Sequence, residues 1–360
     1  MTNKIIFLFC SGIDDVLSGS SQVAGIQVQM SFWARTFVKH GWSVISFTNY
    51  MPNEEFEGIK FVKKSRSKLF SLLHLEILRE FLDCLRCVKL LPDLVFFRGS
   101  SRCLFLLARL CNRKHVWLVY FGASDTDFEP GKEIVGGSSL NRTLYQKSLR
   151  HIESFVTQNK LQHDLLAQYY KKRSLIIPNI WIPYESIRNT KQYDAVWIAN
   201  LRPLKRAEWF VSLAKALPQY QFAIAGGCLI CEYYDKIKRM ANNVANLSFL
   251  GAQSFDEVNK LLSRSRLLVC TSEFEGFPNT FLQAWAQSVP LVSTVNPSNL
   301  IISKNLGVVV GTQEDLKEQV EAVLSNNLLY CDIVNSIEKY FLNTHSADMA
   351  FDLLTNYLSY

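Results

Sequence analysis

The segment from Leu267 to Thr294 limits the fold more than any other part of the chain. It begins with the apolar run Leu267–Thr271, which is typical of a parallel strand buried on both faces. A polar loop follows, and from Asn279 apolar residues recur at the i,i+4 spacing of a helix. Pro290 ends that helix just before a second apolar run, residues 291–294. Strand, loop, helix and strand in this order predict a parallel sheet covered by helices.

The beginning of this helix is suited to binding a diphosphate. The first amides of a helix lack partners within it, and the positive end of the helix dipole attracts anions. At Asn279 and Thr280 these amides come directly after a loop that carries Glu275 and Gly276. Gln283 stands eight positions after Glu275, so both side chains flank the site with groups that bind hydroxyls. The segment therefore predicts a site for a phosphorylated sugar.

These residues resemble the donor-site signature of glycosyltransferase family 4, whose members are retaining enzymes of the GT-B fold. The resemblance rests on Glu275-Gly-Phe-Pro-Asn279, Leu282-x-Ala284-Trp-Ala286 and Pro290-Leu-Val. The family has a second Glu where this chain has Gln283, and a small Gly is usual where Ser288 stands. An ordinary strand–helix unit with a surface Glu is the alternative, and it leaves the order of the motif unexplained.

The resemblance implies an α/β chain with the GT-B fold, in which two Rossmann-like domains face each other across a cleft. A length of 360 residues suits two domains, and strand and helix patterns alternate throughout. We expect an acceptor-side domain at residues 1–182 and a domain that binds the nucleotide-sugar at residues 183–342. The segment 343–360 is expected to be a helix that packs back on the first domain.

A basic loop after the predicted strand 194–199 completes the expected diphosphate site. In the resembled family an Arg and a Lys at this place hold the departing diphosphate. Lys205 matches the Lys, Asn200 stands at the place of the Arg, and Arg202 is close enough to substitute for it. Cations here stabilise the negative charge that builds on the β-phosphate as the glycosidic bond breaks. A solvated basic loop is the alternative.

Four further positions are candidates through the resemblance. Gly25 opens a predicted helix after the loop 11–24, which in the family lies near the transferred phosphate. Asp125 follows a predicted strand where the family often has a His, so it would contact the sugar or acceptor; it and Asp127 equally suit a turn or helix cap. Gly251 lies where the family reads the base with backbone groups, and Phe277 belongs to the signature itself.

No cofactor or metal is expected, because the cations would do the work of a metal. Asp125-Thr-Asp127 has the spelling of a metal motif but lies in the first domain. The nine cysteines are scattered, which is typical of reduced thiols. Two CxxC pairs, Cys84/Cys87 and Cys228/Cys231, raise the alternative of a zinc or redox site, but each pair lies within an apolar pattern.

Charge separates the two halves of the chain. Residues 1–182 hold 24 Lys and Arg against 15 Asp and Glu, whereas residues 183–360 hold 15 against 17. The basic cluster 63–68 leads into a predicted amphipathic helix, Leu69–Leu91, which suits an anionic membrane surface or the protein core. Nucleic acid is not expected as a partner, since no basic run alternates with aromatic residues.

The predicted function is retaining transfer of a sugar from a nucleotide-diphosphate sugar to a glycan or lipid-linked glycan, as in surface polysaccharide synthesis. A UDP-sugar is favoured and a GDP-sugar is the other option. We expect a cytoplasmic protein, peripheral on the inner face of the membrane, because no apolar run approaches the roughly 20 residues of a membrane span. A nucleotide-sugar epimerase of the same fold and a non-catalytic GT-B-like partner remain alternatives.

Overall fold

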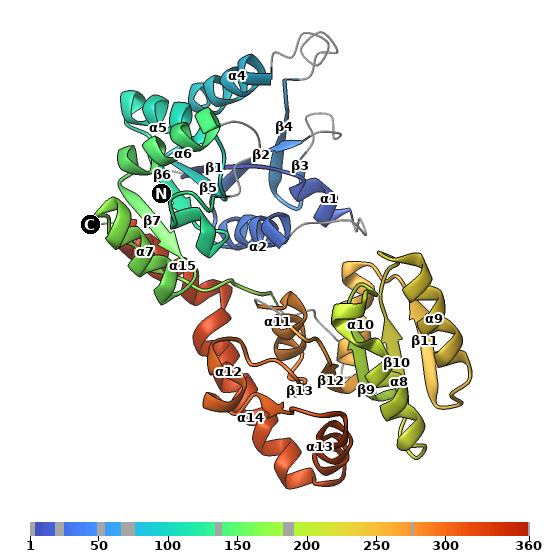
Figure 1. Cartoon of the computed structure of the whole chain (residues 1–360). Helices are drawn as coiled ribbons and strands as arrows, with labels where there is room; N and C mark the ends of the chain where they lie inside the picture. Colours follow the sequence, from blue (N-terminus) through green and yellow to red (C-terminus); the bar gives the residue numbers. More distant parts are fainter. Residues whose placement is uncertain are drawn as a thin grey trace. The chain divides into compact units, whose positions relative to one another are not determined.

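The computed structural model describes residues 4–18, 25–48, 55–65, 76–133, 139–182, 191–274 and 277–358. The described residues form two compact units (Figure 1). Unit 1 contains those up to Ile180 and those from Ala347 onward, and unit 2 contains those between Trp181 and Ser346. The predicted domain ends lay after residue 182 and before residue 343. Trp181 belongs to unit 2 because its side chain is buried and its N–H donates to the carbonyl of His345, 3.0 Å away.

Unit 1 is built on a sheet with the strand order β3-β4-β2-β1-β5-β6-β7-β8. The strands are β1 Ile5–Ser11, β2 Ser43–Thr48, β3 Glu55–Phe56, β4 Ile59–Lys63, β5 Leu94–Arg98, β6 Trp117–Phe121, β7 Ser154–Thr157 and β8 Leu175–Ile176. Every described neighbouring pair is parallel except β3 with β4. Parallel neighbours need a crossover connection, and helices supply most of these connections.

The helices of unit 1 are α1 Ile13–Leu17, α2 Gly25–Lys39, α4 Glu76–Lys89, α5 Cys103–Lys114, η1 Asp125–Phe128, α6 Ser139–His151, α7 Lys160–Tyr170 and α15 Ala347–Leu358. The predicted helix from Gly25 is confirmed. The segment 11–24, expected to be a loop, instead contains α1. Asp14 and Asp15 in the first turn of α1 favour a helix, and Gly12 before it adopts a φ of 93° that an L side chain rarely adopts.

Unit 2 is built on a sheet with the strand order β11-β10-β9-β12-β13-β14, and all its described pairs are parallel. The strands are β9 Tyr193–Ile198, β10 Phe222–Ala225, β11 Leu247–Gly251, β12 Ser265–Cys270, β13 Leu291–Ser293 and β14 Gly307–Val309. The helices are η2 Pro203–Lys205, α8 Ala207–Ala216, α9 Cys231–Asn242, α10 Phe255–Ser263, α11 Asn279–Ala286, η3 Pro297–Asn299, α12 Leu300–Ser303, α13 Gln313–Ser325 and α14 Asn327–His345. The predicted α/β class with parallel sheets in two domains is confirmed.

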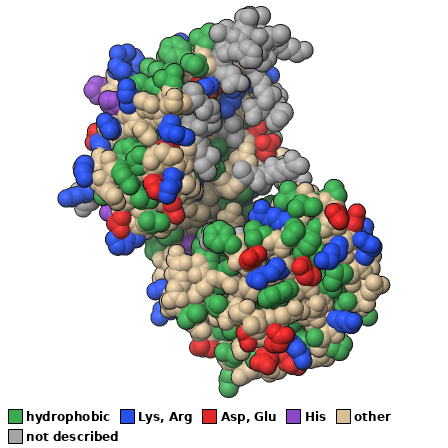
Figure 2. Space-filling model, viewed as in Figure 1, with side chains coloured by type: hydrophobic (Ala, Val, Ile, Leu, Met, Phe, Trp, Pro, Cys, Tyr) green, Lys and Arg blue, Asp and Glu red, His purple; other side chains and the backbone are tan. Residues whose placement is uncertain are grey.

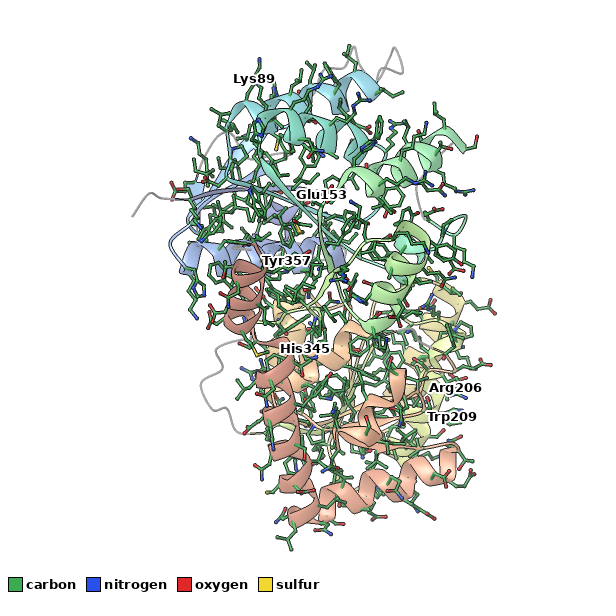
Figure 3. The ribbon with its side chains drawn as sticks, turned by 90° about the vertical axis from the view of Figure 1, so that its left-hand side faces the viewer. Lys89, Glu153, Arg206, Trp209, His345 and Tyr357 are labelled. Carbon is green, nitrogen blue, oxygen red and sulfur yellow. The ribbon has the colours of Figure 1, made fainter. Side chains whose placement is uncertain are left out.

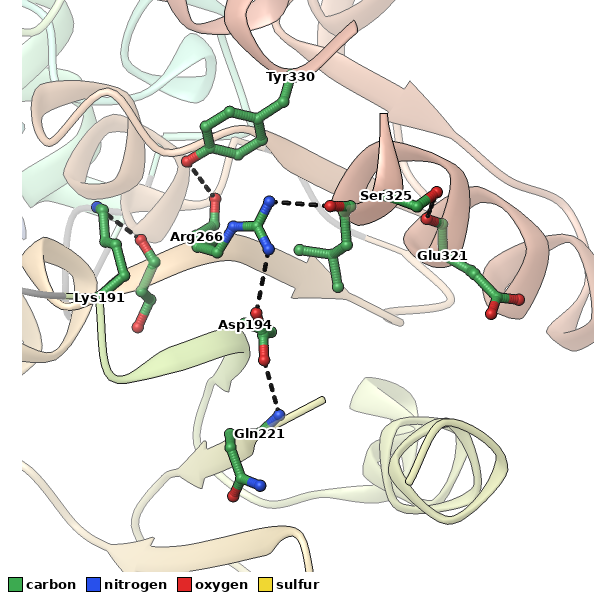
Figure 4. Close-up of polar contacts among 9 residues, drawn as sticks. Lys191, Asp194, Gln221, Arg266, Glu321, Ser325 and Tyr330 are labelled. Carbon is green, nitrogen blue, oxygen red and sulfur yellow. Dashed lines mark hydrogen bonds and ion pairs between the residues drawn. The ribbon is translucent and has the colours of Figure 1, made fainter. Parts of the chain in front are cut away.

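Polar contacts hold the amino ends of two central strands of unit 2 together (Figure 4). Arg266 at the start of β12 pairs with Asp194 at the start of β9, at 3.2 Å, and donates to the carbonyl of Leu324 at 2.9 Å. The hydroxyl of Tyr330 donates to the carbonyl of Arg266 at 3.2 Å. These contacts hold the amino ends of β9 and β12 together. The carboxyl ends of the two strands therefore have a defined register.

The C-terminal helix α15 packs on α2 within unit 1. The ring of Phe351 stacks on that of His40 with centroids 3.8 Å apart and meets the ring of Phe37 edge-on at 5.3 Å. Asp348 pairs with Lys39 at 2.6 Å and with His40 at 3.0 Å. An apolar anchor flanked by an exposed ion pair is the arrangement expected of a docked helix, in which the apolar contact supplies most of the stability.

Phe351→Ala should therefore destabilise unit 1 by about 3 kcal/mol, because it leaves a cavity between α15 and α2. Urea unfolding followed by fluorescence would measure this as a lower midpoint. Leu353→Ala is the matched control, since Leu353 on the same helix is 42% exposed and should change the midpoint little. Equal midpoints for wild type and Phe351→Ala would contradict the role of this contact.

Candidate functional site

A cavity of about 240 Å³ lies in unit 2 at the carboxyl ends of β9 and β12, next to the amino end of α11. Ligands of open α/β sheets bind at the carboxyl ends of the strands, where loops leave neighbouring strands. The cavity is lined by Trp197, Ile198, Ala199, Asn200, Lys205, Leu268, Val269, Cys270, Ser272, Pro278, Asn279 and Thr280. It brings together four predicted site residues from two distant segments: Asn200, Lys205, Asn279 and Thr280.

The loop after β9 reaches the cavity through a short turn rather than through a continuous helix. The sequence predicts that the loop 200–206 opens a helix that runs to residue 217, and α8, Ala207–Ala216, confirms this helix. Within the loop, η2 forms before Arg206, whose φ of 48° lies in the left-handed region. The helix α8 starts at Ala207. The turn at Arg206 breaks the helical path and leaves Lys205 at the wall of the cavity.

Thr271, just after β12, fastens this turn to the neighbouring strand. Its hydroxyl donates to the carbonyls of Lys205 and Arg206, 2.7 and 2.9 Å away, and accepts the indole N–H of Trp197 at 2.9 Å. Two positions later, the N–H of Glu273 donates to the carbonyl of Leu204 at 2.9 Å. The Thr271 side chain is fully buried, so these bonds are shielded from water. The backbone that carries Lys205 is therefore fixed.

Arg206 adds a second connection between the same segments. Its Nε donates to the carbonyl of Thr271 at 2.7 Å, and its Nη2 donates to the carbonyl of Ser272 at 3.1 Å. The guanidinium lies 4.2 Å from the centre of the Trp209 ring, and Figure 3 labels the two residues side by side. Arg206 thus donates its hydrogen bonds to the loop after β12. Its role in this conformation is to stabilise the turn.

Lys205 is the buried cation of the cavity, with 8% of its surface exposed. Burial lowers the pKa of Lys205, and the nearby charge of Arg202 lowers this pKa further. Both causes penalise the protonated amine, so a ligand that brings negative charge into the cavity would relieve a cost that is already present. This is the electrostatic situation expected of a group that binds phosphate.

The amino end of α11 forms another part of the cavity wall. Pro278 holds the N-cap position and, in the described part of the chain, no side chain caps this helix end. Phe281 and Trp285 are buried and anchor α11 to the domain, as the i,i+4 pattern predicts. The predicted start of the helix at Asn279 is confirmed, and its first two residues line the cavity.

Other predicted donor-site residues in unit 2 lie outside the lining of this cavity. Arg202 is exposed, and Phe277 is 39% exposed with its ring edge-on to Trp285 at 6.1 Å. Gly251 ends β11 with a φ of 68°, and its carbonyl accepts the N–H of Gly226 at 2.8 Å. Glu275 and Gly276 lie outside the described residues.

Gln283 has a different environment from the one expected of an exposed donor contact. Only 6% of its surface is exposed, and its Nε2 lies 3.5 Å from Oδ1 of Asn259 on α10. This distance is at the limit of a hydrogen bond and corresponds to a weak one. The ribose contact predicted for Gln283 stays a prediction.

Gly25 and Asp125 both belong to unit 1. Gly25 is the exposed first residue of α2. The carboxylate of Asp125 accepts hydrogen bonds from the side chains of Asn159 at 3.2 Å and Gln162 at 3.1 Å. The alternative role in a helix cap is confirmed for Asp127, which accepts from the amides of Ala123 and Ser124 in a capping box.

Three residues that support the site were not among the predicted site residues: Thr271, Arg206 and Trp197. One signal was available, since Thr271 is a polar residue at the carboxyl end of a buried strand. Within the described ranges, no three His, Cys, Asp or Glu side chains lie close enough together to hold a metal ion.

Comparison with a protein family and with a curated relative identifies what this domain is similar to. The model of the family described as glycosyl transferases group 1 matches residues 192–326. An uncharacterized glycosyltransferase of Methanocaldococcus jannaschii is 23% identical over 203 residues, which cover 54% of this chain and 56% of the relative. The match thus spans little more than half the length of that relative.

Solved structures resemble the whole chain in fold. Sucrose-phosphate synthase from Thermosynechococcus elongatus has a TM-score of 0.67 at 13% identity, with 99% of each chain covered. WaaG, a glycosyltransferase involved in lipopolysaccharide biosynthesis, has a TM-score of 0.57 at 15% identity, with 94% of this chain and 95% of that chain covered. A Staphylococcus aureus TarM mutant in complex with UDP has a TM-score of 0.53 at 16% identity, with 76% and 57% covered.

Proposed function

We propose that this protein is a glycosyltransferase, because residues 192–326 match the model of the group 1 glycosyl transferases and the chain has the GT-B fold. It would move a sugar from a nucleotide-diphosphate sugar to a hydroxyl of a glycan or lipid-linked glycan, with retention at the anomeric carbon. The observation that carries the proposal is the cavity that the buried Lys205 and the amino end of α11 line together.

In this proposal the donor diphosphate lies in that cavity. The first amides of α11 would bind the phosphate oxygens, and the ammonium of Lys205 would stabilise charge on the β-phosphate as the glycosidic bond breaks. Arg202 and Asn200 would add polar contacts at the rim. No metal is required, because the leaving group gains negative charge next to a fixed cation.

The remaining predicted residues would bind the rest of the donor and the acceptor. Glu275, with Gly276 and Phe277, would hold the transferred sugar, and the backbone at Gly251 would contact the base. Gly25 and Asp125 would contribute from unit 1. These assignments rest on the family resemblance, and each is open to a kinetic test by substitution.

A UDP-sugar is the favoured donor, with a GDP-sugar as the second option. The structural neighbour TarM was solved with UDP, which supports a uridine nucleotide, and WaaG acts in lipopolysaccharide biosynthesis, which supports a surface glycan as the product. Both resemble this chain at 15–16% identity, so the nucleotide and the acceptor are part of the proposal.

Incubation with labelled UDP-sugars and GDP-sugars tests the proposal against its alternatives. A transferase releases free nucleoside diphosphate in proportion to added acceptor, and the product keeps the anomeric configuration of the donor. An epimerase instead returns an altered sugar nucleotide. Binding without any turnover would identify a non-catalytic partner, and both of these last results would contradict the proposal.

Gln283 provides a narrower test, because a Glu is expected at its position. A neutral hydrogen bond to the ribose contributes roughly 0.5–1.5 kcal/mol, and the ribose is remote from the reacting bond. Gln283→Ala should therefore raise the donor KM about 3- to 10-fold and leave kcat within a few-fold. Gln283→Glu should keep or tighten donor binding. Unchanged kinetics in both variants would show that the side chain supports only the contact with Asn259.

We further propose that unit 1 attaches to an anionic lipid surface through α4. Ile77, Leu78 and Phe81 on this helix are 66%, 42% and 36% exposed, and Lys89 extends outward from its last turn (Figure 3). Basic side chains are dispersed over the visible face of unit 1 (Figure 2), in keeping with the excess of Lys and Arg in residues 1–182. No helix in the described part of the chain is long and apolar enough to cross a bilayer.

Vesicles that contain an anionic phospholipid should retain the protein at low salt and release it at high salt, since screening weakens electrostatic attraction. Co-sedimentation measures this directly. The double variant Ile77→Ser, Phe81→Ser should reduce retention, whereas Leu328→Ser in unit 2, at an 85% exposed position, should not. Equal retention on neutral vesicles would contradict an electrostatic contribution.

A further inference from the structure

Two exposed thiols lie side by side next to the loop that lines the cavity. The Sγ atoms of Cys228 and Cys231 are 3.0 Å apart, and both residues are exposed. Cys231 is the first residue of α9, and Cys228 stands three positions earlier. A disulfide needs the two sulfurs at about 2.05 Å, so they must approach by only about 1 Å. We propose that Cys228 and Cys231 form a reversible disulfide that alters the cavity.

The second CxxC pair of the chain has the same spacing and the opposite environment. Cys84 and Cys87 are buried within α4, and burial raises the pKa of Cys87 well above its usual value. A buried thiol that keeps its proton is a poor nucleophile and is shielded from oxidants. Exposure and a position at the start of a helix therefore distinguish the pair Cys228/Cys231, whereas spacing alone does not.

The geometry indicates which sulfur reacts first. The thiol of Cys228 donates a hydrogen bond to the sulfur of Cys231, and this bond raises the pKa of Cys228. Cys231 also stands at the amino end of α9, where the helix dipole favours negative charge. We therefore take Cys231 as the attacking thiolate and Cys228 as the resolving thiol.

The oxidant is a small disulfide such as oxidised glutathione. The Cys231 thiolate attacks one glutathione sulfur, which forms a mixed disulfide and releases one glutathione thiolate. Cys228 then loses its proton and attacks the Cys231 sulfur, which forms the protein disulfide and releases the second glutathione. Two protein thiols are oxidised and one glutathione disulfide is reduced to two thiols.

Backbone contacts connect this pair to the cavity. Cys228 forms a bridge with Leu201, whose N–H donates to the carbonyl of Gly227 at 2.9 Å. A Cβ built on Gly226 would lie 1.9 Å from the carbonyl oxygen of Ala199, so the two backbones are packed without space between them. Ala199 lines the cavity. Movement of Cys228 toward Cys231 would therefore shift the segment 199–201 and weaken the binding of a nucleoside diphosphate.

Incubation of the folded full-length chain with oxidised glutathione, followed by intact-mass analysis and peptide mapping, tests the disulfide. We expect wild type to lose the mass of two hydrogen atoms at this pair and to regain it with dithiothreitol. Because resolution by Cys228 is intramolecular, glutathione retained on the pair should stay below about one tenth of that on Cys331. Cys228→Ser should instead retain glutathione on Cys231. Cys331→Ser, which removes a separate exposed thiol, should leave the pair unaffected.

A stable glutathione adduct on the pair in wild type, or no reaction there, would overturn the proposed disulfide. The effect on the cavity is tested by the affinity for UDP, which rests on the proposed function. We expect oxidation to weaken UDP binding about 5-fold in wild type and not in Cys228→Ser. Equal affinity in the two redox states would overturn the link to the cavity, whereas no UDP binding in either state would contradict the proposed function.

Discussion

Lys205→Ala should lower turnover by about 100-fold or more, while UDP affinity falls by at most about tenfold. The reason is the timing of the charge: the β-phosphate becomes more negative as the glycosidic bond breaks, so the ammonium stabilises the transition state more than the bound donor. Steady-state kinetics and calorimetric titration with UDP measure the two effects separately. Near-normal turnover would remove Lys205 from the mechanism.

Two further substitutions separate the charge of Lys205 from other effects. Lys215→Ala removes an exposed lysine from the last turn of α8 and should leave turnover unchanged. Burial lowers the pKa of Lys205, so the amine loses its proton below the usual value of about 10.4 and activity should fall on the alkaline side. Lys205→Arg keeps a cation that stays protonated, and its residual activity should persist to higher pH.

Thr271→Val should lower turnover roughly 10- to 100-fold, although Thr271 is a positioning residue that does not line the cavity. Valine has nearly the shape of threonine but lacks the hydroxyl that joins Trp197 to the backbone of Lys205 and Arg206. Each buried group left without a partner costs about 1–3 kcal/mol, so the turn is expected to relax. Kinetics should show a loss in kcat that exceeds the change in KM.

Thr271→Ser distinguishes this role from one in packing, because it keeps the hydroxyl and removes only a methyl group. Turnover in Thr271→Ser should stay within a few-fold of wild type, while its stability falls by about 1 kcal/mol for the lost methyl group. Turnover in Thr271→Val that matches wild type would mean that the turn is held sufficiently by Arg206 and by the amide of Glu273.

The segments of unit 2 that were predictable are those with a strong local pattern. The helix α11 begins at Asn279 as expected from apolar residues at the i,i+4 spacing. The helix α1 was missed because five residues give too short a periodic pattern, and it lies within a segment rich in Gly and Ser. Local patterns therefore predicted the order of the longer helices and strands, but not the short helix inserted between them.

Residues of the site were predictable only where they belong to a motif that resembles the family. Lys205 and Asn279 come from segments more than 70 positions apart, and the family resemblance alone suggested that they meet at one cavity. The left-handed turn at Arg206 could not be predicted, because Arg has no preference for that conformation. The hydrogen bonds of Thr271 impose it, and they depend on β9 and β12 being neighbours.

The burial of side chains and the distances between them could not be predicted from the sequence. The two CxxC pairs look alike as sequences, but one is buried within α4 and the other is exposed at the start of α9. Gln283 likewise falls at a predicted donor position, and its side chain is buried beside Asn259. Both outcomes depend on how helices pack on one another, which a local pattern does not encode.

In the proposed mechanism, the buried Lys205 and the amino end of α11 bind the β-phosphate of the donor nucleotide. Calorimetric titration of wild type and Lys205→Ala with UDP and with UMP isolates this phosphate. A hydrogen bond to a charged group contributes about 1.5–3 kcal/mol, so wild type should bind UDP at least about tenfold more tightly than UMP. In Lys205→Ala this preference should fall to about threefold or less. The same preference in both proteins, or none in wild type, would contradict this mechanism.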